Sequence, residues 1–323
     1  MLTELENVIR LVEGGKRLTL AAEESLLRKI PKGEWIGGTI PYFMSDAGGT
    51  TSRDRVFVEE MPASARGARI EVYDEHTIKR VAANTSDNGY TVLILPAFSA
   101  IHEKYALDAA SYQDMFLKVV AGWISGVHVD DIGRLSPQVV DGRTGNFYKD
   151  QAVAMHVDLP ASQQAQLGIV NIFEPGDGDE LEFPTNGFTV EKCLVGGSLV
   201  NFATYIAEKK IDTRLPLVAN YMGTHVNVSI QSIAAEKVSL YAPAFSGAKY
   251  RFAKALANYS ECFARAIPTG LEAPAFSCNC ILNYLYGNLE GRRTGVIKGP
   301  MTFGEIGYQL LNQTLVYVSI VAA

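Results

Sequence analysis

The stretch Lys298-Gly-Pro-Met-Thr-Phe-Gly-Glu-Ile-Gly-Tyr308, followed by Asn312-Gln-Thr-Leu-Val-Tyr-Val-Ser-Ile320, decides the fold that we expect for the end of this chain. Three glycines interrupt an apolar run, and the β-branched, alternating segment behind it predicts a strand. Glu305 lies between Gly304 and Ile306. Two interpretations stay open: a solvated turn residue, or a carboxylate in a polar site.

Composition sets the outer limits for the rest of the chain. The 323 residues are 47% hydrophobic, which is enough for one large core or two ordinary ones. Lys and Arg number 29 against 35 Asp and Glu, with no basic stripe, so we expect no nucleic-acid partner. The start of the chain lacks a secretory pattern, and no apolar run approaches the ~20 residues of a membrane span. We therefore expect a cytoplasmic protein without a membrane partner.

The four cysteines do not predict a disulfide framework. Cys278 and Cys280 are two residues apart, so on a strand they would share one face. No second Cys or His pair follows at zinc spacing, and reduced structural thiols are the favoured interpretation.

Patterns along the chain predict an α/β protein. Residues 3–13 have helical spacing with a Gly-Gly stop, and three strand-like runs with a short helix between them follow from Arg55 to Pro96. We interpret residues 99–115 as a loop with a helical turn. A helix is expected at residues 198–209, with Ser198 as its cap.

An acidic loop at residues 174–182 marks the expected domain boundary, with an N-terminal lobe at 1–175 and a C-terminal lobe at 176–323. The segments Trp35-Ile-Gly-Gly-Thr-Ile-Pro-Tyr-Phe43 and Ile297-Lys-Gly-Pro-Met-Thr-Phe-Gly-Glu305 are similar: each is a short apolar strand that breaks on glycine and leads to an aromatic residue. We therefore expect two related lobes with mixed β-sheets flanked by helices, facing one another.

The closing segment resembles a known family. Gly299-Pro-Met-Thr-Phe-Gly-Glu-Ile-Gly307 and Leu311-Asn-Gln-Thr-Leu315 are similar to the C-terminal part of the FIST sensory domain, in which an aromatic-rich Gly-Glu-Ile turn precedes a His-Asn-Gln-Thr strand. Leu311 stands where that family has histidine. Phe276-Ser-Cys278 resembles the family's preceding strand, and Gly37-Gly-Thr-Ile-Pro-Tyr42 matches its glycine-rich N-terminal turn without the glutamate.

This resemblance implies a two-lobed sensory module that binds a small molecule, with amino acids or related metabolites as suggested ligands. Some members of the family bind haem as gas sensors. This chain has no room for an attached signalling domain, so a sensory role implies a separate signalling protein as partner.

A ligand site is expected where the two similar segments meet. Hydroxyl, carboxylate and amide groups cluster around one turn there, and glycines let a ligand approach the backbone. The same polar groups could instead satisfy buried backbone atoms. The expected site residues are Gly37, Gly38, Thr39, Tyr42, Cys278, Thr302, Phe303, Gly304, Glu305, Asn312 and Gln313.

Rival functions rest on weaker patterns. His128-Val-Asp130 and His156-Val-Asp158 could form a metal site if they lay on adjacent strands, although strand ends facing water explain them as well. For haem, His225 beside Tyr221 and Met222, or His128, would be the axial donor. The sequence contains no nucleophile elbow, phosphate loop or zinc-protease motif, and a cysteine hydrolase that uses Cys278 stays open.

Overall fold

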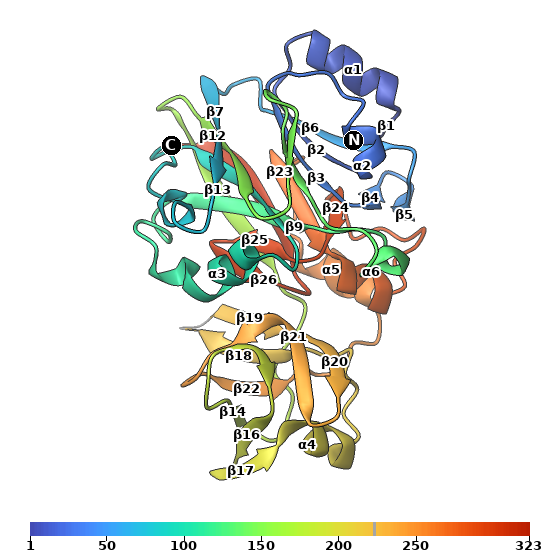
Figure 1. The fold of residues 1–323 in the computed structure, drawn as a ribbon, viewed down its shortest axis with the longest axis vertical. Coiled ribbons are helices and arrows are strands. Elements are labelled where there is room, and N and C mark those ends of the chain that lie inside the picture. The colour runs from blue at the N-terminus through green and yellow to red at the C-terminus, as the bar shows by residue number, and fades with distance from the viewer. Residues whose placement is uncertain (222–223) are drawn as a thin grey trace.

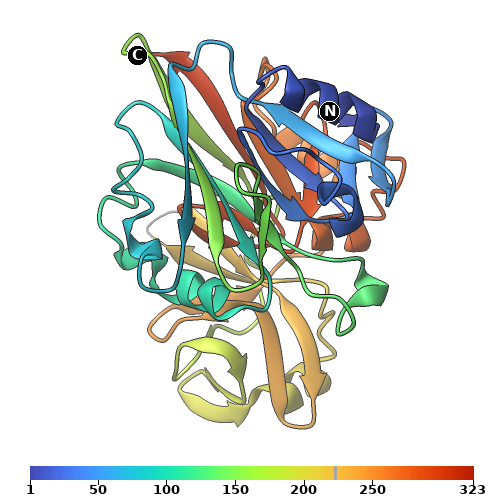
Figure 2. The same cartoon turned by 45° about the horizontal axis from the view of Figure 1, so that its top comes forward.

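The computed structural model of this chain describes residues 1–221 and 224–323. Strands account for 42% of the chain and helices for 17%, and the strands form five sheets. The expectation of mixed sheets flanked by helices is thus confirmed in outline, but the protein is mainly β. Figures 1 and 2 show a large body that contains both termini and a smaller body, coloured yellow to orange, at one end of the long axis.

The large body is built from one unit that occurs three times. In each unit an outer strand is followed by two parallel strands joined through a helix, then by a hairpin, and finally by a strand that returns beside the first parallel strand. The first unit contains β1 (Leu2–Thr3), α1 (Leu5–Glu13), β2 (Leu18–Ala22), α2 (Glu24–Leu27), β3 (Trp35–Thr39), β4 (Tyr42–Ser45), β5 (Gly48–Thr51) and β6 (Val56–Glu60).

The second unit repeats this order. Its elements are β7 (Gly67–Tyr73), η1 (Ile78–Arg80), β8 (Tyr90–Pro96), α3 (Ala100–Asp108), η2 (Ala109–Ser111), β9 (Val119–Ser125), η3 (Val129–Asp131), β10 (Val139–Asp141), β11 (Asn146–Tyr148) and β12 (Ala152–Asp158).

The third unit is divided by an insertion of residues 171–275. The unit contains β13 (Gln163–Val170), β23 (Phe276–Cys280), α6 (Ile281–Tyr286), β24 (Gly299–Thr302), β25 (Glu305–Gly307), β26 (Gln309–Leu311) and β27 (Leu315–Ala322). The insertion contains β14 (Leu181–Glu182), β15 (Gly187–Val190), β16 (Lys192–Val195), β17 (Ser198–Asn201), α4 (Phe202–Lys209), β18 (Leu217–Tyr221), β19 (Thr224–Val228), β20 (Ile230–Ala234), β21 (Lys237–Ala244), β22 (Lys249–Phe252) and α5 (Tyr259–Ala266).

Sheet topology closes the three units into a ring. Each six-stranded sheet has the same order: outer strand, returning strand, the parallel pair, and then a hairpin donated by another unit. The three orders are β1-β6-β2-β3-β10-β11, β7-β12-β8-β9-β25-β26 and β13-β27-β23-β24-β4-β5. In all three, only the central pair is parallel. The body therefore has pseudo-threefold symmetry, and its sheets do not divide into two lobes at residue 175.

Close packing between units explains Gly38, the second of the paired glycines in the first unit. A Cβ atom on Gly38 would lie 2.7 Å from the Trp123 ring and 3.1 Å from the Ser125 Cβ atom. The backbone of β3 approaches β9 at this point, and only glycine fits. The close approach of another strand therefore explains Gly38.

Two local expectations were wrong. The region 99–115 contains α3 rather than a loop, and the Ser99 hydroxyl caps this helix by accepting a hydrogen bond from the His102 N–H. In the segment 198–209 the helix begins only at Phe202, after strand β17, and its cap is Asn201 rather than Ser198. In both cases a cap in front of a short helix sets its start.

Candidate functional site

The carboxyl ends of the three parallel pairs lie next to one another. The Gly126 N–H donates to the Thr39 carbonyl oxygen at 2.7 Å, and the Phe303 N–H donates to the Ile124 carbonyl oxygen at 3.1 Å. The second strand of each pair ends in a hydroxyl residue, and the three residues Thr39, Ser125 and Thr302 are all buried. Ligands of open α/β sheets bind at such strand ends, so the connections that follow them are the first place to search.

Tyr42 follows the first of these strand ends and packs against the connection that follows β9. Its ring stacks on His128, with ring centres 5.4 Å apart, and its hydroxyl oxygen accepts the Val129 N–H at 3.0 Å. The His128 Nδ1 atom lies 3.3 Å from the Asp130 backbone nitrogen and 3.5 Å from the Asp130 carboxylate.

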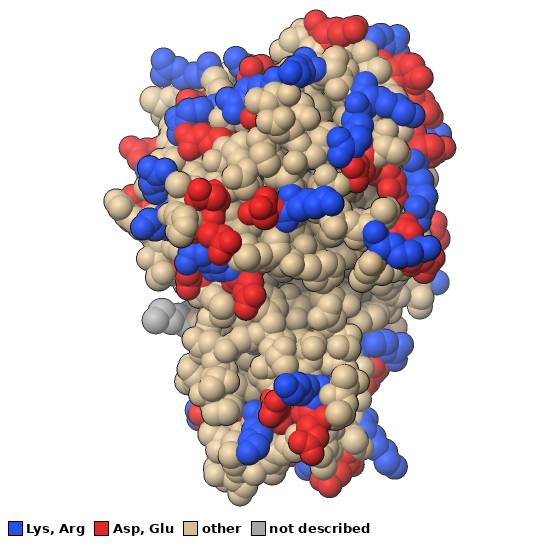
Figure 3. Space-filling model, viewed as in Figure 1, with Lys and Arg blue, Asp and Glu red and all other residues tan. Residues whose placement is uncertain are grey.

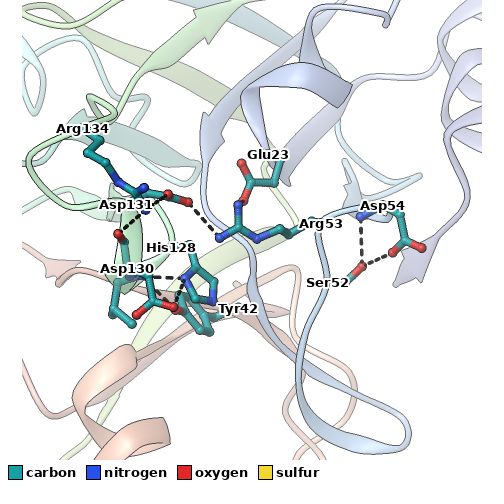
Figure 4. A network of polar contacts seen from close by, with 10 residues as sticks. Glu23, Tyr42, Ser52, Arg53, Asp54, His128, Asp130, Asp131 and Arg134 are labelled. Carbon is teal, nitrogen blue, oxygen red and sulfur yellow. Dashed lines mark hydrogen bonds and ion pairs between the residues drawn. The ribbon is translucent and has the colours of Figure 1, made fainter.

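Arg53 holds the same region together through two carboxylates (Figure 4). Its Nη2 donates to Asp131 at 2.8 Å, and its Nη1 lies 3.6 Å from Glu23. Burial raises the pKa of Glu23, and the nearby Arg53 opposes that rise. Because the guanidinium is shared by both carboxylates, the cluster joins the connections after β2, β5 and β9 and acts first as a structural clamp.

Glu305 is fully buried on β25, so it is not a solvated turn residue. One carboxylate oxygen accepts hydrogen bonds from the Thr314 hydroxyl at 2.7 Å and from its N–H at 3.2 Å. The other oxygen has no hydrogen-bond partner within the described part of the chain. Burial raises the pKa of Glu305 to about 8, and the hydrogen bonds from Thr314 oppose that rise. The group is therefore predominantly a neutral carboxylic acid at pH 7.

Asn312 and Gln313 attach the insertion to the large body. The Ser229 hydroxyl on the insertion lies 2.8 Å from the Asn312 Oδ1 atom and 2.5 Å from the Gln313 Oε1 atom. The Gln313 side-chain N–H also donates to the Arg214 carbonyl oxygen at 3.2 Å. These amides satisfy buried groups between two bodies, which is one of the two roles that their sequence context left open.

Cys278 and Thr302 also make internal contacts. The Cys278 thiol donates to the Gly122 carbonyl oxygen at 3.1 Å, and burial raises the pKa of this thiol well above its ordinary value. A thiol of that kind is a weak nucleophile because its thiolate is disfavoured. The Thr302 hydroxyl donates to the carbonyl oxygens of Gly304 and Asn279.

A cavity of about 300 Å³ lies between α3 and the insertion, beside the ends of β8 and β24. Phe303 is the one expected site residue that lines it. The other lining residues come from the β8–α3 connection, from α3 and from strands β15, β20 and β21: Ala97, Phe98, Ser99, His102, Glu103, Phe188, Thr189, Gln231, Ser239, Leu240 and Tyr241.

His102 is an unsatisfied polar group in the wall of this cavity. Its side chain is 8% exposed, and Nε2 has no hydrogen-bond partner in residues 1–221 and 224–323. Burial lowers the pKa of His102 to about 4, so the imidazole is neutral at pH 7. Leaving such a group unpaired costs about 1–3 kcal/mol, and Nε2 itself is buried, with almost no accessible surface.

Phe98, at the turn from β8 into α3, is strained and exposed at once. It has a φ of +62°, which is rare for a bulky residue, and its side chain is 56% exposed. Its ring contacts Phe303 edge-on, with centres 6.0 Å apart. Strained residues are concentrated at functional sites, and here the strain places an aromatic ring at the cavity.

The family of this chain follows from comparison with known protein families. Residues 3–321 match the model of a family described as "Family of unknown function (DUF6976)". The chain belongs to this family. No match to the FIST family accompanies it, so the FIST resemblance of the C-terminal segment was misleading. A search of curated proteins found no match.

The alternative sites in this DUF6976 chain do not come together. His128 lies in the Tyr42 cluster, whereas His156 is buried on β12 and contacts the hydroxyls of Tyr73 and Thr91. Within the described residues, no three His, Cys, Asp or Glu side chains are grouped so that they could hold a metal ion. Of the haem donors, His225 lies on β19, and its neighbour Met222 is outside the described residues. None of the helices in the described part of the chain is long and apolar enough to cross a membrane.

Proposed function

We propose that this protein binds a small molecule in the cavity between α3 and the insertion. The observation that carries the proposal is a cavity of about 300 Å³ whose lining includes four aromatic side chains, Phe98, Phe188, Tyr241 and Phe303. Pockets of this kind combine apolar surface with a few placed polar groups. The strained Phe98 and the position at the ends of β8 and β24 point to the same place.

We do not propose a sensory role for this protein. It rested on the FIST resemblance, as did the suggestion of an amino-acid ligand and of haem, and the family match replaces that resemblance. The thiol enzyme that uses Cys278 is also not favoured, because this thiol is buried with a raised pKa.

Melting-temperature measurements on the protein with an open cavity and with a blocked cavity test the proposal. We expect compounds from a metabolite library to raise the melting temperature of the unmodified protein, because a ligand at ~100 times its Kd adds ~2.7 kcal/mol to stability. Gln231 is exposed on β20 and lines the cavity, so Gln231→Trp should block it without loss of folding. The shifts should then disappear.

Ser232→Trp is the matched control, because Ser232 is the exposed neighbour on the same strand and does not line the cavity. It should keep every shift. The proposal fails if no compound stabilises the protein, or if the shifts persist unchanged in Gln231→Trp.

A further inference from the structure

Aromatic side chains reach the cavity from both bodies. Phe98, at the turn from β8 into α3, and Phe303, in the connection after β24, belong to the large body. Phe188 on β15 and Tyr241 on β21 belong to the insertion. Each of these side chains is at least partly exposed, so a molecule in the cavity can touch it. The Phe98 and Phe303 rings lie edge to face, with an interplanar angle of 71°.

One charged side chain lines the cavity, and it is acidic. None of the described lining residues is Lys or Arg, and burial keeps His102 neutral at pH 7. Glu103, in the first turn of α3, is exposed, and its carboxylate has no ion-pair or hydrogen-bond partner in the part of the chain that the structure describes. Its neighbour Lys104 is bound to Asp108 instead, at 2.9 Å. Figure 3 shows that much of the surface at the junction of the two bodies is uncharged on the face in view.

Aromatic rings and one free carboxylate suit a particular kind of cation. The faces of aromatic rings are negative, so a positive group within about 6 Å of a ring centre is attracted to them. A metal ion such as Ca²⁺ needs several oxygen ligands, which a single carboxylate does not supply. An ammonium group that carries alkyl substituents combines the charge with an apolar surface that packs against the rings.

We infer that the cavity binds a small organic cation with an alkylated ammonium group, held by the aromatic rings and by the Glu103 carboxylate. This inference rests on the proposed ligand site and specifies the chemistry of its ligand. An uncharged molecule of the same shape would make the same apolar contacts without the attraction to the ring faces and to Glu103. An anion of that shape would be repelled by the carboxylate.

Calorimetric titration with three molecules of one shape tests the inference. Choline carries a trimethylammonium group, neohexanol has a tert-butyl group in its place, and tert-butylacetate is the corresponding anion. We expect choline to bind at constant ionic strength. Neohexanol and tert-butylacetate should bind at least about tenfold more weakly, because both lack the positive charge.

Two variants locate the source of the preference for choline. Glu103→Gln removes the carboxylate charge, and Phe98→Leu removes an aromatic ring but keeps an apolar side chain. Both positions are exposed, so both variants should fold. Each should weaken the binding of choline at least about threefold more than the binding of neohexanol. The matched control is Glu208→Gln on α4, which removes an exposed glutamate that does not line the cavity and should keep the parent's affinity.

The outcomes separate this inference from the proposed function. Equal binding of choline and neohexanol, or no binding of choline, would overturn the cation, and so would choline binding that both variants leave unchanged. The proposed function would then still stand if Gln231→Trp abolished the melting-temperature shifts that other compounds produce. Failure of every compound to bind, choline included, would overturn both.

Discussion

At the scale of single residues, equivalent positions of the three units carry different side chains with different roles. Three strands end in Thr39, Ser125 and Thr302, and the residues three positions later are Tyr42, His128 and Glu305. Tyr42 and His128 stack at the clamp, whereas Glu305 is enclosed in the core. The sequence identified Tyr42 and Glu305 as unusual, but it could not show that one joins connections between strands and the other is a buried acid.

The buried acid predicts how stability depends on pH. Folded protein keeps a proton on Glu305 up to a pKa of about 8, whereas in the unfolded chain the ordinary value is 4.5. The stability that this group contributes is therefore fully present below pH 4.5 and is lost as pH rises through about 8. Between those values the slope is at most about 1.4 kcal/mol per pH unit.

Glu305→Gln should flatten this dependence, because glutamine stays uncharged. We expect urea unfolding at pH 5, 6.5 and 8 to show a smaller loss of stability with pH in the variant than in the parent. The pKa of Glu59 is also raised, so some slope will remain. Glu290→Gln, at an exposed position of the same unit, should keep the full slope. An equally steep slope in Glu305→Gln would contradict the assignment.

At the scale of elements, local signals predicted strands better than short helices. The long apolar run at residues 117–127 predicts a buried strand, and the structure has β9 there. Helix α3 was missed because Ser-Ala-Ile-His-Glu-Lys-Tyr mixes polar and aromatic residues without a clear period. Its buried side chains include His102 as well as Ile101 and Tyr105, so the buried face is not purely apolar. The cavity wall was missed with it, and the Ser99 cap was the one available signal.

The clamp that Arg53 forms between strand connections should contribute to the stability of the protein. Arg53 pairs with Glu23 and Asp131, whose side chains are only 15% and 14% exposed. Removing the guanidinium leaves both carboxylates partly buried without this partner, so Arg53→Ala should lower the free energy of unfolding by about 1–2 kcal/mol. Urea unfolding measures the loss.

Arg134→Ala is the comparison for that variant. Arg134 also binds Asp131, but its side chain is 69% exposed, and such pairs contribute less than about 1 kcal/mol. We expect its loss to be clearly smaller than that of Arg53→Ala. Equal losses would mean that Arg53 is an ordinary surface ion pair and that the clamp does not hold the connections.

At the scale of the whole molecule, the similarity between residues 35–43 and 297–305 reflects a real repeat. The two segments are equivalent, since each contains the second parallel strand of a unit and the start of its hairpin. The third copy was hidden because β9 is followed by a long connection before β10. The insertion between β13 and β23 also breaks the period of the third unit. Two visible copies therefore suggested two lobes where the structure has three units.

The insertion gives the large body its candidate site. Its strands β15, β20 and β21 supply one wall of the cavity, and the strand ends and α3 of the large body supply the other. Neither body encloses the space alone. Residues far apart in sequence, such as His102 and Tyr241, line the same space, which no local pattern in the chain could reveal.

A crystal structure of the protein soaked with the compound that most raises its melting temperature is the most direct test of this account. We predict electron density for that compound in the cavity between α3 and the insertion, in contact with Phe98 and Phe303. Clear density for the compound elsewhere on the molecule, with the cavity empty, would contradict it.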